Sequence, residues 1–394
     1  MNVKIVIATI MREHGETGVQ THFRRFMEYL EGEGKPGRIA TPFHAPKSLV
    51  YPVFGLRKAI DRLSGRYGVW WYRYWHSVFL ETVLKGILRD DERAIVYAQC
   101  PVSAKAALRA RRNTSQKVFM VVHFNHSQAE EWAEKGKIRK GDWVYENILR
   151  LEKEVMPQLD GIVFVSRYMA DHIERRIPEI RNVRKFISPN FMRKEVGEPT
   201  NVKGDLINIG TLESRKNQEY LLRVLFECAR VGKSYTLTLV GEGPDRNRLE
   251  SLSEALGIRS QVNFLGYRKS AARLLDGHKV YVHASRMENL PYTIIEAFAF
   301  GIPVIAGAVG GIPEILAEDG EGYFWPLDDP AEGARRVITV LENEALRRRL
   351  SEGAGERFLR DFESTVVAGR LHEFLTGHFS GCRSGQVPGG WKCI

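Results

Sequence analysis

Short apolar runs alternate with longer amphipathic stretches along most of the chain. A short run of this kind predicts a buried strand, and an amphipathic stretch with helical periodicity predicts a helix. The first half predicts a strand, a helix and three further strands, at residues 4–9, 21–30, 94–98, 118–123 and 161–166. Such alternation is typical of a parallel sheet with helices on both faces.

The alternation starts again after residues 195–205, a polar segment rich in turn formers that predicts an interdomain linker. Predicted strands follow at residues 206–210, 235–240, 262–265 and 279–283, and predicted helices at 217–231, 246–256, 331–341, 344–362 and 365–375. Because 394 residues exceed one typical core, we expect two doubly wound α/β domains. They would occupy residues 1–197 and 198–362, with a helix at 363–377 and a flexible tail at 378–394.

Composition places the protein among ordinary globular chains. It is 43% apolar and 10% aromatic, which excludes wholesale disorder. The opening residues predict a strand rather than a signal peptide, and no apolar run reaches the length of a membrane span. Cys100, Cys228, Cys382 and Cys393 lack the spacing of metal ligands, which fits a reducing cytosol. Pairing or modification of the last two, which share the tail, stays open.

The positive charge is concentrated in the first half. Residues 1–200 hold 34 Lys and Arg against 23 Asp and Glu, whereas the whole chain has a net charge of only +10. This excess indicates an anionic partner, such as a phospholipid surface, a lipid diphosphate or nucleic acid, or else serves solubility. Residues 54–89, between the first two of the strands predicted above, combine several arginines with Trp70, Trp71 and Trp75. This mixture suits a lipid interface, or equally the packing of two helices.

Two glutamates eight positions apart, Glu288 and Glu296, carry the most specific chemical signal. A helix is predicted between Glu288 and Gly301, with Asn289 as its cap and Pro291 in its first turn. A carboxylate in this apolar stretch needs donors if it is buried, and a ribose diol supplies two. The alternative is that Glu296 lies on the solvent side of an ordinary helix.

Glycines and cations nearby predict phosphate binding. Gly310 and Gly311 precede a predicted helix start, where backbone N–H groups can approach an anion, although they could equally form a tight turn. Arg215 and Lys216 lie at a strand-to-helix turn, a position that is unfavourable for cations unless an anion lies between them. Together these residues indicate a site for a nucleotide sugar. Two further residues at predicted strand ends, Gly241 and Tyr267, could border the base or the ribose.

At these residues the chain resembles the donor half of the family 4 glycosyltransferases. The segments are GTLESRKN (210–217), LVGEGP (239–244), FLGY (264–267) and the stretch from Glu288 to Glu314. The family has the GT-B architecture, in which two Rossmann-like domains face each other across a cleft. The resemblance implies that Glu288 contacts the donor sugar and that Glu296 holds the ribose. It also implies that Arg215 and Lys216 bind the diphosphate, helped by backbone N–H groups of Asn289, Leu290, Gly310 and Gly311.

The first half resembles the family more loosely. Its segment GETGVQTHF (15–23) is similar to the family's glycine loop, which implies that Gly18 lies near the donor phosphate and Gly15 near the acceptor. In VVHFNHS (121–127), His126 aligns with the family's donor-sugar histidine. His123 is predicted either near the acceptor or in a structural hydrogen bond. Phe191 replaces the glycine of the family's Pro-Asn-Gly turn at Asn190.

These observations predict a retaining, metal-independent glycosyltransferase. We expect transfer from a UDP- or GDP-sugar to a saccharide acceptor, lipid-linked and part of a cell-envelope polysaccharide such as O-antigen, capsule or exopolysaccharide. No cofactor is expected, since no Asp-x-Asp motif accompanies the site. The protein would be cytoplasmic, and its first domain would make a peripheral contact with an anionic membrane. The alternatives are a GT-B sugar-nucleotide epimerase and a basic nucleic-acid-binding protein, although no nucleic-acid-binding motif is present.

Overall fold

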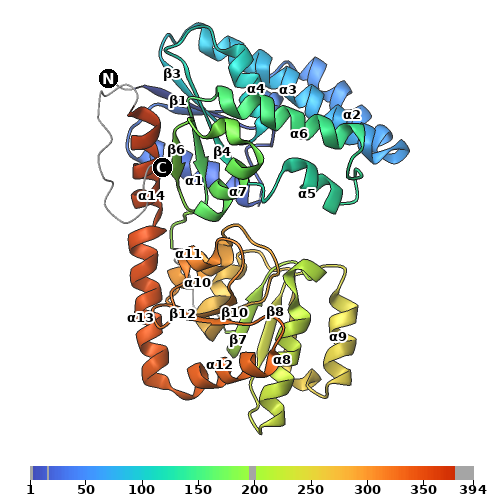
Figure 1. Cartoon of the computed structure of the whole chain (residues 1–394), viewed down its shortest axis with the longest axis vertical. Helices are drawn as coiled ribbons and strands as arrows, with labels where there is room; N and C mark the ends of the chain where they lie inside the picture. Colours follow the sequence, from blue (N-terminus) through green and yellow to red (C-terminus); the bar gives the residue numbers. More distant parts are fainter. Residues whose placement is uncertain (1–2, 16, 195–200, 378–394) are drawn as a thin grey trace. The chain divides into compact units, whose positions relative to one another are not determined.

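The computed structural model describes residues 3–15, 17–194 and 201–377. These residues form two compact units (Figure 1). Unit 1 runs to Pro189 and includes the helix that begins at Ser364, and unit 2 is Asn190–Glu363. Most of the expected linker, the expected tail, Cys382 and Cys393 lie outside the described residues. The chain enters unit 2 before the expected boundary at 197, because Met192 already bonds to the backbone of Phe362 there.

Unit 1 is built on a six-stranded parallel sheet of order β2-β1-β3-β4-β5-β6. Its central strand β3 is buried at all five positions, as the continuous apolar run predicts. The strands are β1 (Lys4–Ala8), β2 (Gly37–Ala40), β3 (Ala94–Ala98), β4 (Lys117–Val122), β5 (Gly161–Phe164) and β6 (Lys185–Ile187). The helices of the first half are α1 (Gly18–Gly32), α2 (Lys47–Leu63), α3 (Gly65–Arg89), α4 (Pro101–Ala110), α5 (Gln128–Glu134), α6 (Trp143–Val155) and α7 (Arg167–Arg176).

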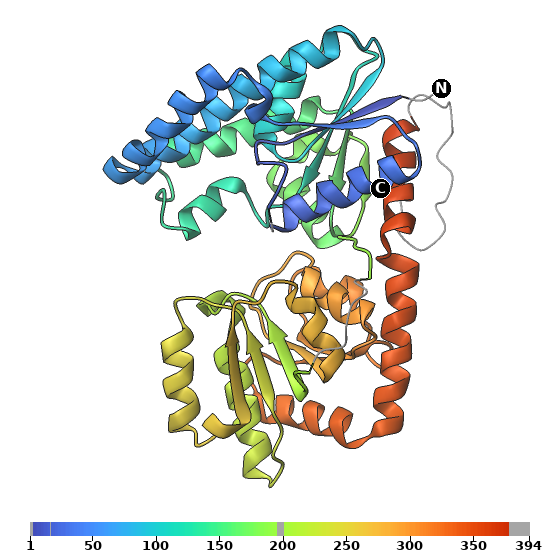
Figure 2. The ribbon, with the colours of Figure 1, turned by 180° about the vertical axis from the view of Figure 1, so that it is seen from behind.

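The last helix of the described chain, α14 (Ser364–Thr376), packs on this unit rather than on the one that precedes it. It lies beside α1 (Figure 2), where the rings of His372 and Tyr29 are 6.4 Å apart. Phe374 stacks on Phe186 at 4.9 Å and meets Phe119 edge-on at 5.5 Å. These aromatic contacts bury the apolar face of α14 against the sheet of unit 1.

Helices α2 and α3 form an antiparallel pair, in which some aromatic residues of the insertion are packed and others are exposed. Trp75 and Val50 belong to an apolar cluster between the two helices. On the opposite side of α3, Trp70 and Tyr74 stack at 5.4 Å and are 37% and 49% exposed. The aromatic residues therefore divide between packing and surface according to the helical period. Among the described residues, no helix is long and apolar enough to cross a membrane.

Unit 2 repeats the architecture with a parallel sheet of order β12-β11-β10-β7-β8-β9 (Figure 1). Its strands are β7 (Gly204–Ile209), β8 (Leu237–Val240), β9 (Val262–Gly266), β10 (His278–His283), β11 (Val304–Gly307) and β12 (Gly322–Trp325). Its helices are α8 (Gln218–Arg230), α9 (Arg246–Ala255), α10 (Tyr292–Ala299), α11 (Ile312–Ile315), α12 (Pro330–Glu342) and α13 (Glu344–Asp361). Both units are therefore Rossmann-like, as predicted.

Candidate active site

Two loops of unit 2 are joined at the carboxyl ends of neighbouring strands. β7 and β10 pair in parallel, so the loops that follow them leave the same edge of the sheet. The Arg286 N–H donates to the carbonyl oxygen of Arg215 at 3.0 Å, and the Arg215 guanidinium donates to the carbonyl oxygen of Met287 at 3.3 Å. Arg286 also donates to the side chain of Asn217, which has a left-handed backbone with φ 55°. These hydrogen bonds fix the position of the two loops relative to each other.

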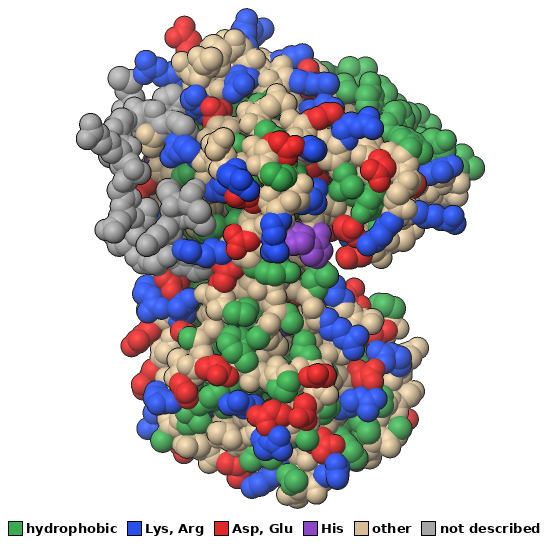
Figure 3. Space-filling view, viewed as in Figure 1, with side chains coloured by type: hydrophobic (Ala, Val, Ile, Leu, Met, Phe, Trp, Pro, Cys, Tyr) green, Lys and Arg blue, Asp and Glu red, His purple; other side chains and the backbone are tan. Residues whose placement is uncertain are grey.

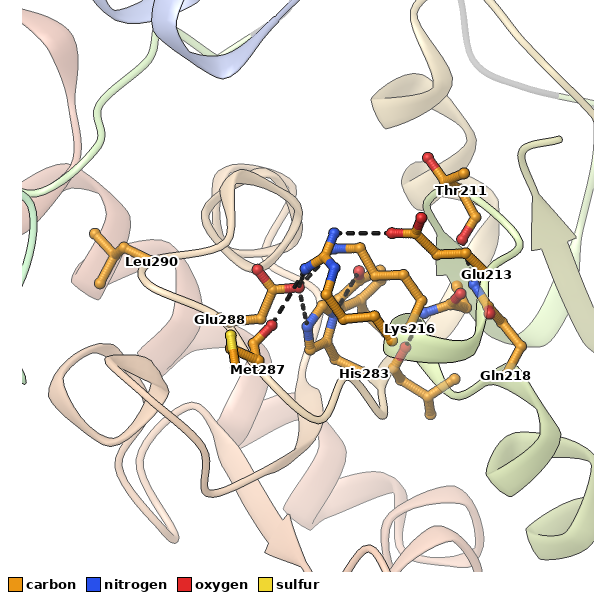
Figure 4. A network of polar contacts seen from close by, with 12 residues as sticks. Thr211, Glu213, Lys216, Gln218, His283, Met287, Glu288 and Leu290 are labelled. Carbon is orange, nitrogen blue, oxygen red and sulfur yellow. Dashed lines mark hydrogen bonds and ion pairs between the residues drawn. The ribbon is translucent and has the colours of Figure 1, made fainter. Parts of the chain in front are cut away.

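Glu288 lies at the centre of this junction (Figure 4). Its Oε1 is 2.5 Å from Lys216 Nζ, 3.8 Å from an Arg215 guanidinium nitrogen and 3.5 Å from His283 Nε2. Burial alone would raise the pKa of Glu288, but the contact with His283 and the charge of Lys216 outweigh it and hold the pKa well below its usual value. Glu288 is therefore an ionised, buried carboxylate at neutral pH.

His283, which the sequence reasoning did not single out, completes the cluster. It ends β10 and is 2% exposed. Burial lowers its pKa although Glu288 opposes this, so the ring is neutral at pH 7. The Tyr281 hydroxyl lies 3.2 Å from Nδ1. If that hydroxyl donates, the ring proton is on Nε2 and points at Glu288. The one sequence signal was its position at a strand end, next to the predicted site.

The structure changes the argument for Arg215 and Lys216. From the sequence alone, two cations at a helix start are unfavourable unless an anion lies nearby. In the structure, carboxylates of the chain itself are these anions. Glu213 binds the second nitrogen of Arg215 at 2.9 Å, while Glu288 binds Lys216. The cations thus have partners before any substrate arrives. The side chains of Arg215 and Lys216 remain 38% and 20% exposed, so both can still reach a ligand at this edge.

The helix that carries Glu296 starts later than expected. Pro291 is its N-cap residue and Tyr292 its first residue, so the prediction that Asn289 caps it is wrong, because the backbone turns helical only after the proline. Asn289 and Leu290 are instead buried in the preceding loop, where the Asn190 side chain donates to the carbonyl oxygen of Leu290 at 2.7 Å. Glu296 lies within α10 and is half-buried, between the two alternatives considered.

The glycines of the site allow backbone segments to touch. Gly310 has φ 58°, and a Cβ there would lie 1.7 Å from the carbonyl oxygen of Glu288. Gly311 donates its N–H to the same oxygen at 3.4 Å. The helix that follows is only four residues long, so its dipole is small. Gly241 behaves similarly, with φ 143° and a virtual Cβ 2.0 Å from the Gly210 carbonyl oxygen. Tyr267, beyond β9, is 59% exposed.

Gly310→Ala tests whether this contact positions Glu288. The added methyl group must displace the backbone of Glu288, and alanine must keep a backbone φ that is strained for it. We therefore expect the free energy of unfolding to fall by about 2–4 kcal/mol. Gly355→Ala is the matched control. Its virtual Cβ meets nothing within 4 Å in α13, so this change should stabilise the helix by about 0.5–1 kcal/mol. Thermal and denaturant unfolding measure both, and equal stability of the two variants would contradict the assignment.

The remaining candidates lie in unit 1. Gly18 is the exposed first residue of α1. A Cβ on Gly15 would lie 2.2 Å from the side chain of Gln20, whose amide donates to the carbonyl oxygens of Arg12 and His14 at 2.9 and 3.0 Å. Gly15 therefore lets Gln20 hold the loop between β1 and α1.

The two histidines at the end of β4 differ in their surroundings. Burial lowers the pKa of His123 to about 3, and its Nε2 lies 3.4 Å from the Gln99 side-chain oxygen. Its ring meets that of His22 at 4.9 Å. His123 therefore has partners within unit 1, and its place near the acceptor stays a prediction. His126 is half-buried, and its Nδ1 is 2.7 Å from His172 Nε2. Among the described residues, no group of three or more His, Cys, Asp or Glu could hold a metal ion.

Comparison with known proteins links both units to sugar transfer. A family profile described as "Glycosyltransferase Family 4" matches residues 17–190, and one described as "Glycosyl transferases group 1" matches residues 191–357. The chain is 33% identical over 151 residues to N-acetyl-alpha-D-glucosaminyl L-malate synthase of Bacillus anthracis, covering 38% of this chain and 40% of that protein. It is 29% identical over 162 residues to the lipopolysaccharide core biosynthesis glycosyltransferase LpsD of Rhizobium meliloti, covering 41% and 46%. These matches span less than half the length of each relative.

A solved structure extends the likeness to the whole fold. HepE of Anabaena, crystallised in complex with UDP, superposes with a TM-score of 0.67 at 16% identity. The superposition covers 95% of this chain and 100% of HepE. At this identity the likeness establishes the two-domain fold alone.

Proposed function

Because this chain belongs to the family 4 glycosyltransferases, we propose that it transfers a sugar from a nucleoside diphosphate donor to an acceptor hydroxyl. The family retains the anomeric configuration and needs no metal ion. The observation that carries the proposal is the cluster of Glu288, Lys216 and Arg215 at the carboxyl ends of β7 and β10. Ligands of open parallel sheets bind at such an edge.

The cluster can stabilise a departing diphosphate. Negative charge grows on the leaving diphosphate as the bond to the sugar breaks, and Arg215 and Lys216 would stabilise it electrostatically. Glu288, kept ionised, would hold Lys216 in place and accept hydrogen bonds from hydroxyls of the donor sugar. The diol of the ribose is assigned to Glu296. The family resemblance implies front-face substitution, in which the departing diphosphate receives the acceptor proton.

A thermal-shift series over UDP-, GDP- and ADP-sugars tests donor binding. One donor class should raise the melting temperature, and EDTA should leave the shift unchanged. The UDP complex of HepE makes UDP-sugars the first choice. Prolonged incubation of that donor without acceptor separates the alternatives. An epimerase would bring the sugar nucleotide to an equilibrium mixture with its epimer, whereas a transferase would at most hydrolyse it slowly. Stabilisation by none of the donors would overturn the proposal.

The acceptor is assigned to a membrane-bound saccharide. The relative in lipopolysaccharide core biosynthesis supports an envelope polysaccharide. The exposed apolar surface of α2 and α3 supports contact with the inner face of an anionic membrane (Figure 3). Leu49, Leu56 and Leu63 of α2 are 58%, 54% and 87% exposed. Lys58 and Arg62 lie on the same helix and would attract anionic headgroups.

Replacing Leu49, Leu56 and Leu63 together with serine should weaken binding to phosphatidylglycerol–phosphatidylcholine vesicles about 10-fold or more, because each leucine loses apolar burial in the interface. Co-sedimentation measures the partitioning. Leu359→Ser is the control, since Leu359 is 63% exposed on α13 of the other unit. Unchanged sedimentation of the triple variant would remove membrane contact through α2.

A further inference from the structure

Unit 1 contains a cavity of about 650 Å³, and one of the residues that line it is Gly15, which the family resemblance places near the acceptor. It lies between the loop after β1 and the pair of helices α2 and α3. Arg12 and Gly15 line it from the loop, Arg57 and Lys58 from α2, and Tyr72 from α3. The loop leaves the carboxyl end of a strand in a parallel sheet, the edge at which such folds bind ligands.

The cavity carries unbalanced positive charge. Arg57 lies 3.3 Å from Asp61, the one carboxylate among the residues that line the cavity. Within the described part of the chain, Arg12 and Lys58 have no carboxylate in ion-pair range. The buried His76 adds no charge, since burial lowers its pKa to about 3. Two cations at the same opening, with no counter-charge among the residues that the structure describes, favour an anionic ligand with several acceptor oxygens.

Aromatic rings form the rest of the wall. The guanidinium of Arg12 lies 4.9 Å from the centroid of Phe43, and that of Arg57 lies 4.3 Å from the centroid of Tyr72. Phe54 stacks on the neutral His76 at 4.1 Å. The rings hold the guanidinium groups by cation–π contact and leave their N–H edges available. They also offer flat apolar faces to the hydrocarbon or sugar next to an anion.

The same helix joins the cavity to the apolar surface. Arg57 and Lys58 line the cavity, whereas Leu56 and Leu63 of α2 point to solvent. A ligand whose anionic part occupies the cavity can therefore keep an attached apolar chain along the surface of α2. Such a ligand is an amphiphile with phosphate next to hydrocarbon.

We propose that this cavity binds the phosphate or diphosphate of a lipid-linked acceptor, with the phosphoryl oxygens on Arg12 and Lys58. The assignment rests on the proposed sugar transfer, for which it names the acceptor class. The lipid would follow the exposed side of α2, and the aromatic wall would contact the first groups on either side of the phosphate.

Calorimetric titration with farnesyl diphosphate tests the assignment. Saturating UDP is present throughout, so that the diphosphate site of unit 2 is filled. The double variant Arg12→Gln, Lys58→Gln should bind the probe about 10–100-fold more weakly, because two charge-assisted hydrogen bonds are lost. Lys153→Gln is the control, since Lys153 pairs with Glu179 at 3.0 Å on the surface of unit 1 and does not line the cavity. It should bind within about 2-fold of the unchanged protein.

Two further probes identify the source of the anion. Farnesol should not bind measurably, and inorganic pyrophosphate should bind more weakly than farnesyl diphosphate. Equal affinity for pyrophosphate and farnesyl diphosphate would overturn the lipid-linked acceptor. Equal affinity of the double variant and the unchanged protein would overturn the site itself. The rise in melting temperature on addition of UDP is measured separately for the unchanged protein and for the double variant. Its absence from both would defeat the sugar-transfer proposal, whatever the farnesyl diphosphate titration shows.

Discussion

Lys216→Ala is expected to lower kcat by about 10²–10³-fold. The ammonium group would stabilise charge that develops on the diphosphate only as the bond to the sugar breaks, and removal of one such donor typically costs this much. The donor dissociation constant should rise much less, since the ground-state diphosphate keeps Arg215 as a partner. Initial rates at saturating donor, together with a donor titration, separate these two quantities.

The control for this variant is Lys233→Ala in the same unit. Lys233 pairs with Glu342 at 2.8 Å on the surface of unit 2, away from the two loops of the site, and its loss should leave kcat within about 2-fold because exposed pairs contribute little. If Lys216→Ala kept near-normal kcat and only weakened donor binding, Lys216 would be a substrate anchor without a role in the transition state. If only its melting temperature fell, the lysine would serve to position Glu288.

Several strands and helices could be predicted from their apolar period, whereas helices α4, α5, α6 and α7 were not predicted. The central strands β3 and β4 and the long helices α8, α12 and α13 lie within one or two residues of their predicted bounds. β2, β6 and β12 were not predicted. β2 and β6 are the edges of the sheet of unit 1, and β12 is an edge of the other. β2 is partly exposed, and β6 and β12 are mostly buried, but a strand of three or four residues is too short to show an apolar period. The sequence placed residues 54–89 directly between the first two predicted strands. In the structure the unpredicted strand β2 comes before this insertion.

The sequence predicted which residues belong to the site better than it predicted the contacts between them. Glu288 and Lys216 could be identified because each stands at a strand-to-helix junction, yet no local pattern shows that they pair across 72 positions of chain. The same holds for Gly310, whose need for glycine arises from the backbone of Glu288 rather than from a ligand. His283 gave one sequence signal, its position at the end of a predicted strand, and nothing in its own pattern distinguished it further. Contacts between distant loops require the sheet order, which a local pattern does not contain.

The coupling between Glu288 and Lys216 leads to the second large effect. Glu288→Gln removes the charge at nearly constant shape and leaves a mostly buried ammonium without its counter-charge. We expect kcat to fall by about 10²-fold or more, because Lys216 loses its position. The double variant Glu288→Gln, Lys216→Ala should then be hardly slower than either single variant, since the two groups act as a unit. If the fold-decrease in kcat of the double variant equalled the product of the two single decreases, the two groups would act independently and this coupling would be contradicted.

The stability of Glu288→Gln carries a pH signature with a definite sign. The folded state holds the pKa of Glu288 below its usual value of 4.5, so the folded state binds fewer protons there than the unfolded chain. The carboxylate therefore stabilises the fold fully above about pH 5 and progressively less as the pH falls below 4.5. We expect the variant to be about 2 kcal/mol less stable at pH 7, less than for a fully buried pair because Lys216 is 20% exposed. Denaturant unfolding at pH 7 and pH 4 should show this difference shrinking toward acid, and a difference that grew instead would mean that Glu288 is protonated in the folded protein.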